Sequence, residues 1–150
     1  NIPKKVQKII DKENFDESAK KEFLSGAKIA YETIITSFSS GNIKAIKTLL
    51  DKKVFNEFNE AIKDREEKKL ISETTFIGIN SAKIKEHNQL NNMFEISVDF
   101  VSEIISCIRD KDKKIISGNP EKIKKVYDTW KFSRDIKSLN PNWLLIDTQA

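Results

Sequence analysis

The chain has 150 residues and a formal net charge of +4, from 27 Lys and Arg against 23 Asp and Glu. This length suits one domain, which would bury about 70% of the surface that its unfolded chain exposes. Cys107 and His87 are the only residues of their types. A single cysteine cannot form a disulfide within one chain, which is compatible with a reducing compartment. One cysteine and one histidine also cannot make the usual zinc-site patterns, so we expect no metal or other cofactor.

Hydropathy and charge narrow the class of protein further. The longest apolar run, at 143–146, is far below the ~18 residues of a membrane-spanning helix, and we expect this portion of the chain to be soluble. Because the chain starts at Asn1 without a signal-peptide pattern, we expect a trimmed part of a longer protein. The positive charge comes mostly from Lys, in segments that also carry acids. We interpret it as solvated surface and do not expect a nucleic-acid partner.

The first half of the chain is predicted to be helical. Residues 1–13 have the spacing of a short amphipathic helix. Asp16 is a suitable N-cap for a long helix, whose apolar residues recur at helical spacing until Gly41 ends it. Asn42 can begin a shorter helix, and a third is predicted at 54–69.

Period-two alternation predicts strands in the second half. One strand is expected at 76–86, and in the next Phe94 begins an alternation that holds up to Phe100. Beyond it Val101 and Ile105 fall on the polar side, which indicates a bulge, a bend or a second covered surface. Shorter strands are predicted at 114–117, 126–136 and 143–148. Helices followed by antiparallel strands favour an α+β fold, with helices packed on a curved sheet of about four strands.

Five segments, in their order and spacing, resemble the Tim44-like domain family. They are GAKIAYETIITSFSSGN at 26–42, VFNEFNEAIKDRE at 54–66, FIGINSAKI at 76–84, ISVDFVSEIIS at 96–106 and WKFSRDIKSLNPNW at 130–143. The likeness covers roughly residues 20–150, and we assign a Tim44-like domain to 14–150.

The resemblance implies a cone-shaped, nuclear-transport-factor-two-like fold in which a curved sheet and helices enclose an apolar pocket. It also implies a peripheral inner-membrane protein that binds anionic lipid, notably cardiolipin. The expected protein partner is a chaperone or a translocase component, on the side that faces the bacterial cytoplasm or the mitochondrial matrix. A ribosomal relative leaves a ribosome-tethering role as an alternative.

The amphipathic segment at 1–13 is the first candidate site. Its apolar stripe could enter a bilayer while flanking ammonium groups meet phosphates, each lysine contributing about 1 kcal/mol. The residues expected to bind lipid are Val6, Ile9, Ile10, Lys4, Lys5, Lys8 and Lys12. The alternative is that the stripe packs on the domain or frays.

The apolar face of the sheet is the second candidate site. Its predicted pocket residues are Phe94, Ile96, Val98, Phe100, Asp128, Trp130 and Phe132. A carboxyl among apolar groups must find a donor or lose its charge, so Asp128 could orient a small ligand or act as a general base. The simpler interpretation, which we favour, is that it accepts from a nearby backbone, Arg or indole donor.

Charged residues at strand ends are a third candidate. Arg109-Asp110 and Arg134-Asp135, together with Glu103, could recognise a carboxylate or phosphate, but we favour a structural ion-pair cluster. His87 is predicted to face solvent with Lys83 and Lys85, which disfavours a His-Asp catalytic pair.

The sequence therefore favours a non-enzymatic, membrane-associated domain in protein translocation or membrane-protein biogenesis. A ligand-binding or enzymatic member of the same fold, with Asp128 in its pocket, is the principal alternative.

Overall fold

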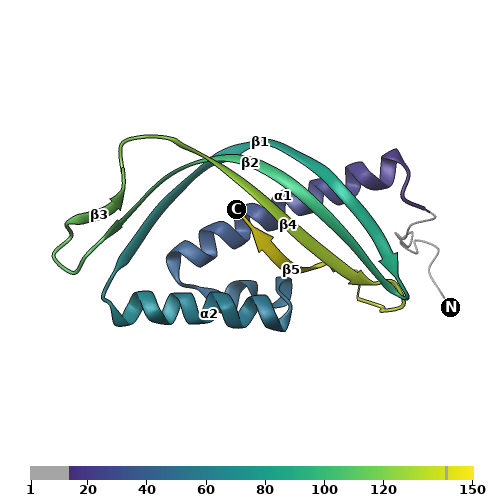
Figure 1. Cartoon of the computed structure of the whole chain (residues 1–150), viewed down its shortest axis with the longest axis horizontal. Coiled ribbons are helices and arrows are strands. Elements are labelled where there is room, and N and C mark those ends of the chain that lie inside the picture. The colour runs from purple at the N-terminus through teal and green to yellow at the C-terminus, as the bar shows by residue number, and fades with distance from the viewer. Residues whose placement is uncertain (1–13, 141) are drawn as a thin grey trace.

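The computed structural model describes residues 14–140 and 142–150 (Figure 1). The predicted amphipathic helix at 1–13 lies outside the described residues. The elements, in chain order, are α1 (Glu17–Ser40), the 3-10 helix η1 (Ile43–Leu49), α2 (Lys52–Glu67), β1 (Ile71–Leu90), β2 (Met93–Arg109), β3 (Ile115–Gly118), β4 (Lys124–Asp135) and β5 (Leu144–Gln149).

Both predicted ends of the long helix α1 are confirmed. The Asp16 carboxylate accepts a hydrogen bond from the Ala19 backbone N–H at 2.9 Å, which satisfies one of the donors left free in the first turn. At the other end Gly41 adopts a left-handed conformation with φ 83°, and the Asn42 N–H donates to the Ser37 carbonyl at 2.9 Å. This closes the helix with the glycine termination that its sequence predicts.

The two following helices differ in how they begin. Asn42 precedes η1, but its side chain makes no capping hydrogen bond, and the element is a 3-10 helix. Asp51 caps α2 by accepting from the Val54 N–H at 2.8 Å. From α2, the Arg65 guanidinium donates to the Phe38 carbonyl at 3.0 Å and so ties the end of α1 to α2.

The strands form one antiparallel sheet of five strands, in the order β1-β2-β4-β5 with β3 paired to the end of β2. Helices that precede and cover an antiparallel sheet confirm the predicted α+β class. The short β3 corresponds to the strand predicted at 114–117, and because it joins the sheet, the sheet has five strands where about four were expected.

The sheet is curved, as predicted, and forms an arch over α1 (Figure 1). Its irregularities lie mainly on β1, where the register against β2 places extra residues at Ile77, Asn80 and Lys85. The irregularity predicted beyond Phe100 lies on the facing strand, because the extra residues Ile77 and Asn80 of β1 fall opposite this part of β2, whereas the register between β2 and β4 is unbroken from Met93 to Ile104. Bulges bend and twist the strand that carries them, so β1 supplies much of the curvature.

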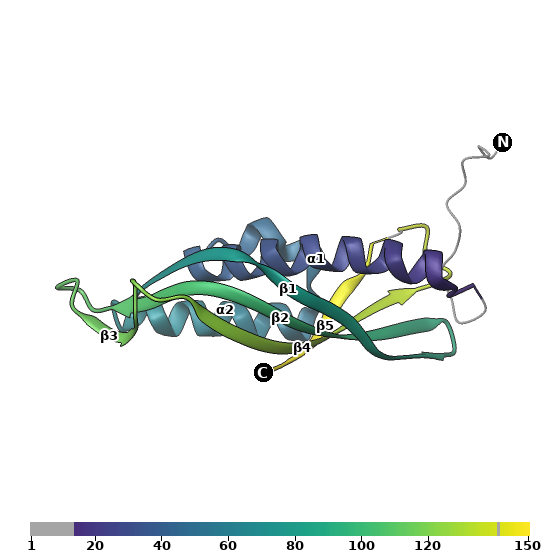
Figure 2. The same cartoon turned by 90° about the horizontal axis from the view of Figure 1, so that it is seen from above.

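The concave face of the arch packs on the helices, and Figure 2 shows α1 and α2 lying along the sheet. Tyr31 is fully buried at its centre, with its ring stacked on Phe100 at 4.2 Å between centroids and tilted against Trp130 at 4.6 Å. Nearer the start of α1, Phe23 meets Phe132 edge-on at 5.9 Å. The core is therefore an aromatic layer between α1 and the sheet.

The last strand connects this core to the other helices. Leu145 is fully buried on β5 and forms an isolated parallel bridge with Leu50, just before α2. Its carbonyl accepts from the Asp51 N–H at 3.0 Å. The bridge joins the sheet to the segment that begins α2.

Candidate functional site

The seven predicted pocket residues lie together on the concave face. In the ladder between β2 and β4, Phe100 opposes Asp128, Val98 opposes Trp130 and Ile96 opposes Phe132. Except for Asp128, each is buried, with at most 4% of its surface exposed. Side chains of α1 pack against this face, so the sheet residues that we expected to enclose a pocket form the packed core.

Asp128 is half-buried at the side of this core and accepts a hydrogen bond from the Tyr31 hydroxyl at 2.5 Å. The same hydroxyl lies 2.9 Å from the Ser102 hydroxyl. Burial raises the pKa of the Asp128 carboxyl, and the hydrogen bond from Tyr31 opposes this shift. Burial and the contact with Asp128 also raise the pKa of Tyr31.

The donor to Asp128 differs from the backbone, Arg or indole group that we expected. Tyr31 lies 97 residues earlier in the chain, and only the crossing of α1 over β4 brings the two side chains together. A carboxyl and two hydroxyls that share hydrogen bonds can orient a polar group of a small ligand, and they also satisfy one another when no ligand is bound.

The histidine lies on the opposite face from the one predicted. The extra residue at Lys85 shifts the alternation of β1, so His87 pairs with the buried Ile96. Its ring meets Phe15 edge-on at 4.8 Å and Phe94 at 5.8 Å. The placement of His87 on the same strand face as Lys83 is therefore wrong, although its side chain is exposed, as predicted.

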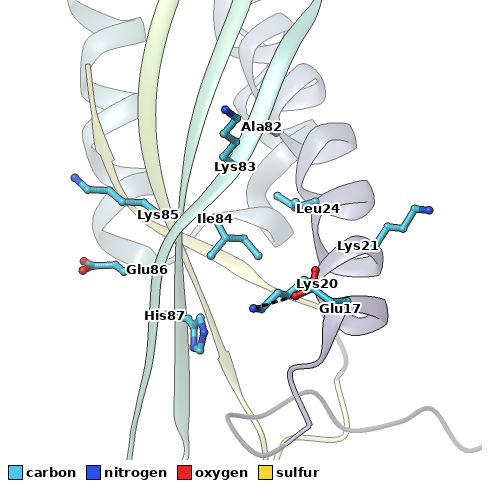
Figure 3. A pocket seen from close by; sticks show the side chains of 10 residues that line it. All are labelled: Glu17, Lys20, Lys21, Leu24, Ala82, Lys83, Ile84, Lys85, Glu86 and His87. Carbon is cyan, nitrogen blue, oxygen red and sulfur yellow. Dashed lines mark ion pairs between the residues drawn. The ribbon is translucent and has the colours of Figure 1, made fainter.

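A groove of about 810 Å³ lies between the first half of α1 and the middle of β1 (Figure 3). It is lined by Glu17, Lys20, Lys21, Leu24, Ala82, Lys83, Ile84, Lys85, Glu86 and His87. In Figure 3, Leu24 and Ile84 point into the space between helix and strand, whereas Lys85 and Glu86 extend to the other side of β1.

The polar end of this groove carries a paired charge. The Lys20 ammonium lies 3.5 Å from the Glu17 carboxylate and 5.7 Å from the centroid of the Phe15 ring. The groove thus combines an apolar strip, formed by Leu24 and Ile84, with several lysines, of which Lys20 is paired with Glu17. The sequence did not indicate this groove, because it depends on how α1 and β1 are placed.

The charged strand ends do not form the predicted cluster around Glu103. Arg109 instead pairs with Glu73 on β1, at 3.0 Å between Nε and Oε1. This contact holds the pKa of the Glu73 carboxyl below its usual range. Asp110 accepts from the backbone N–H groups of the following turn, at 2.8 Å from Asp112 and 2.9 Å from Lys114.

The second predicted pair is also separated. Arg134 lies opposite Phe94, and its buried Nε has no hydrogen-bond partner within the described structure. Asp135 accepts from the Lys137 N–H at 3.0 Å and shapes the turn after β4. Neither arginine is positioned with Glu103 to bind a shared anion.

The predicted lipid-binding residues all fall within 1–13, outside the described residues. Across 14–140 and 142–150, no helix has the length and hydropathy needed to cross a bilayer. In the same two ranges, no three His, Cys, Asp or Glu side chains gather as metal ligands would.

Fold and core together define an α+β domain in which helices fill the concave face of a curved antiparallel sheet. The model of the Tim44-like domain family matches residues 10–150, and the chain belongs to this family. The resemblance drawn from the sequence is therefore confirmed, and the fold is the predicted α+β class. Membership suggests a membrane-associated role related to translocation.

Solved structures include similar domains. The intermembrane space region of the chloroplast protein ARC6 has a TM-score of 0.53 and 11% identity, covering 89% of this chain and 95% of that one. A protein of Campylobacter jejuni described as an NTF2-like transpeptidase has a TM-score of 0.33 and 11% identity, covering 82% and 95%. At these identities the ARC6 likeness concerns the fold alone. A comparison with curated protein sequences found no match.

Proposed function

We propose that this chain is a non-enzymatic, peripheral inner-membrane domain that binds anionic lipid and a protein partner. Its process would be protein translocation or membrane-protein biogenesis, on the side that faces a reducing compartment. The observation that carries the proposal is the match of the Tim44-like family model to residues 10–150.

The packing of the concave face supports a role in binding rather than catalysis. Tyr31, Phe100 and Trp130 fill the centre of this face in mutual contact. The groove between α1 and β1 and the outer surfaces remain for binding, which suits a docking domain.

The protein partner is tested by crosslinking the full-length protein in its native envelope and identifying what is captured. We expect chaperones or translocase components to dominate the captured proteins. Their absence would remove the translocation role and leave only the lipid contact. Co-sedimentation with ribosomes that survives removal of membranes would instead support the tethering alternative.

The lipid contact is tested by sedimenting the protein with phosphatidylcholine vesicles that contain or lack cardiolipin. We expect binding that requires cardiolipin and is reversed by salt, because exposed charge pairs are screened. Deleting 1–13 should weaken it, since this segment carries four lysines and an apolar stripe. Unchanged binding after the deletion would place the contact elsewhere.

The alternative function, a ligand-binding or enzymatic domain, has one structural observation in its favour. Asp128 is a half-buried carboxyl with a raised pKa and a direct hydrogen bond from Tyr31, as a ligand-orienting group would have. Native mass spectrometry of the purified protein would detect a retained metabolite. A metabolite whose affinity falls in Asp128→Ala would support this alternative over the membrane role.

A further inference from the structure

The end of the arch carries a projecting segment, residues 109–125, which we call the flap. It comprises the end of β2, the turn after it, β3, and the connection into β4. In both Figure 1 and Figure 2 it extends beyond the ends of α1 and α2, at one extreme of the long axis. Pro120 is half-buried, and the other residues from 111 to 125 are exposed.

Positive charge is concentrated on the flap. The segment has seven Lys and Arg against three Asp and Glu, so its net charge of +4 equals that of the whole chain. Arg109 is paired with Glu73, but none of the six flap lysines forms an ion pair with a described residue. The structure thus places this basic segment at one end of the molecule.

Large apolar side chains are exposed among these lysines. Ile115, Ile116 and Ile123 have 41%, 53% and 57% of their surface exposed. Two residues beyond the flap, Tyr127 is 62% exposed. The flap thus exposes isoleucines among ammonium groups that have no ion-pair partner in the described part of the chain.

From this geometry we infer that the flap docks on an anionic lipid surface, an inference that rests on the proposed function and locates its lipid contact. Isoleucine side chains can enter the acyl boundary while the lysines meet head-group phosphates, and tyrosine prefers the interface between them. This contact is separate from the segment at 1–13.

The composition of the flap favours lipid over other anionic partners. Protein interfaces are enriched in aromatic residues and Arg and depleted in Lys, whereas the flap has six lysines, one arginine that is already paired, and a single exposed aromatic residue beside it, Tyr127. Binding of single-stranded nucleic acid uses several aromatic platforms on which successive bases stack, and one tyrosine does not provide them.

A hollow of about 470 Å³ lies at the base of the flap. Its lining includes the hydroxyl residues Thr74, Ser106 and Ser117 and the lysines Lys122 and Lys124. Hydroxyl and ammonium groups are donors to phosphate oxygens, so the residue types around this hollow are compatible with a lipid head group.

The first test removes charge from the flap. Lys111, Lys114, Lys122 and Lys125 are changed together to Gln, and vesicle binding is measured with phosphatidylcholine vesicles containing cardiolipin. A matched control changes the exposed Lys28, Lys44, Lys52 and Lys63 of the helices, which lowers the net charge equally. We expect affinity to fall at least about a hundredfold in the flap variant and only slightly in the control.

The second test removes the apolar contact. Ile116→Ser with Ile123→Ser should lower vesicle affinity at least about tenfold, since less apolar surface leaves water on binding. Ile29→Ser with Leu90→Ser is the control, because those side chains are 68% and 72% exposed away from the flap. A polarity-sensitive fluorophore on Ile116→Cys should shift to the blue on binding, whereas one on Ile29→Cys should not.

These experiments distinguish a failure of the flap assignment from a failure of the proposed lipid-binding role. If the intact protein binds cardiolipin vesicles and both flap variants bind equally well, the flap assignment is wrong and the lipid role stands. If the intact protein binds no vesicles, the lipid role fails and the flap assignment with it. If heparin binds as tightly as vesicles and the isoleucine changes have no effect, the flap is a general polyanion surface and not a lipid contact.

Discussion

The Tyr31 hydroxyl connects three elements through one oxygen atom. It is carried by α1, donates to Asp128 on β4 and lies within hydrogen-bond distance of Ser102 on β2. The ring beneath it is stacked on Phe100, so the side chain is held by packing as well as by polar contacts. Removing the oxygen alone separates these two contributions.

We predict that Tyr31→Phe lowers the free energy of unfolding by about 1–3 kcal/mol, measured by urea denaturation. The ring and its stacking remain, but the Asp128 carboxyl and the Ser102 hydroxyl lose their shared partner. The pKa of Asp128 should also rise further, since the hydrogen bond that opposed the shift is gone. Tyr127→Phe, at a 62% exposed position, is the control and should leave stability unchanged.

The Asp128 carboxyl should make stability depend on pH. Its pKa is raised in the folded protein, so above about pH 4 the native state retains a proton that the unfolded state has released. The contribution of this group to the free energy of unfolding is therefore largest at low pH and is lost as pH rises through the folded pKa.

Asp128→Asn should abolish the decrease in the free energy of unfolding with rising pH, because the amide oxygen still accepts from Tyr31 and no charge has to be buried. Urea denaturation at a series of pH values measures this free energy. At neutral pH the variant should be at least as stable as the unchanged protein. Asp99→Asn, on the convex face beside Thr129, should retain the pH dependence. A variant at Asp128 with the pH dependence intact would contradict this assignment.

Single residues also mark the limit of what the sequence could show. The alternation along β4 predicted that Asp128 shares a face with Trp130 and Phe132, but it could not name Tyr31 as the donor, because no local pattern links positions 97 residues apart. His87 was misplaced because one extra residue in β1 reverses the alternation, and nothing in the sequence of that strand identifies Lys85 as the extra one.

At the scale of elements, the glycines show how turn geometry sets the ends of helices and strands. Gly41 and Gly118 both have positive φ, at 83° and 81°, but their surroundings differ. A Cβ at Gly41 would lie 3.7 Å from Arg65 Nη2, whereas one at Gly118 would lie 2.4 Å from the Ser106 carbonyl oxygen. The first position tolerates a side chain at the cost of backbone strain alone, and the second has no room.

We predict that Gly118→Ala detaches β3 from β2, because the backbone of Ser106 cannot yield to the new methyl group. Hydrogen exchange of the β3 amides should accelerate strongly, with little change in the core. Gly41→Ala should lower the free energy of unfolding by only about 1 kcal/mol. Gly26→Ala, in α1 with open space around it, should instead raise the free energy of unfolding by about 0.5–1 kcal/mol. Unchanged exchange in Gly118→Ala would contradict the close approach.

Elements with strong local signals were predictable. The Asp16 cap, the helical spacing and Gly41 defined α1 almost to the residue, and the alternation from Phe94 to Phe100 defined the core of β2. The bulges of β1 were not predictable, because they depend on the register between β1 and β2, which a single sequence does not contain. The lysines of the flap are close together in the sequence, but the projection of that segment beyond the helices was not predictable.

For the molecule as a whole, the short strand β5 is important because it joins the sheet to the helices. Its six residues close one edge of the sheet, and the bridge between Leu145 and Leu50 joins that edge to the helices. The two main layers, otherwise connected through α1, thus acquire a second attachment.

We predict that Leu145→Ala lowers the free energy of unfolding by about 2–5 kcal/mol in urea denaturation, because a fully buried leucine is replaced by a cavity. Leu144→Ala is the neighbouring control, since that side chain is 37% exposed. Equal effects at the two positions would show that β5 is not anchored as described.

The irregular spacing of β1 has a consequence beyond the shape of the arch. This long strand borders the sheet on one side, and a regular border of that length would offer unpaired amide and carbonyl groups to another polypeptide. Extra residues at Ile77, Asn80 and Lys85 break that row into short stretches. A second copy of the chain therefore meets only short regular stretches along β1, which disfavours edge-to-edge polymerisation.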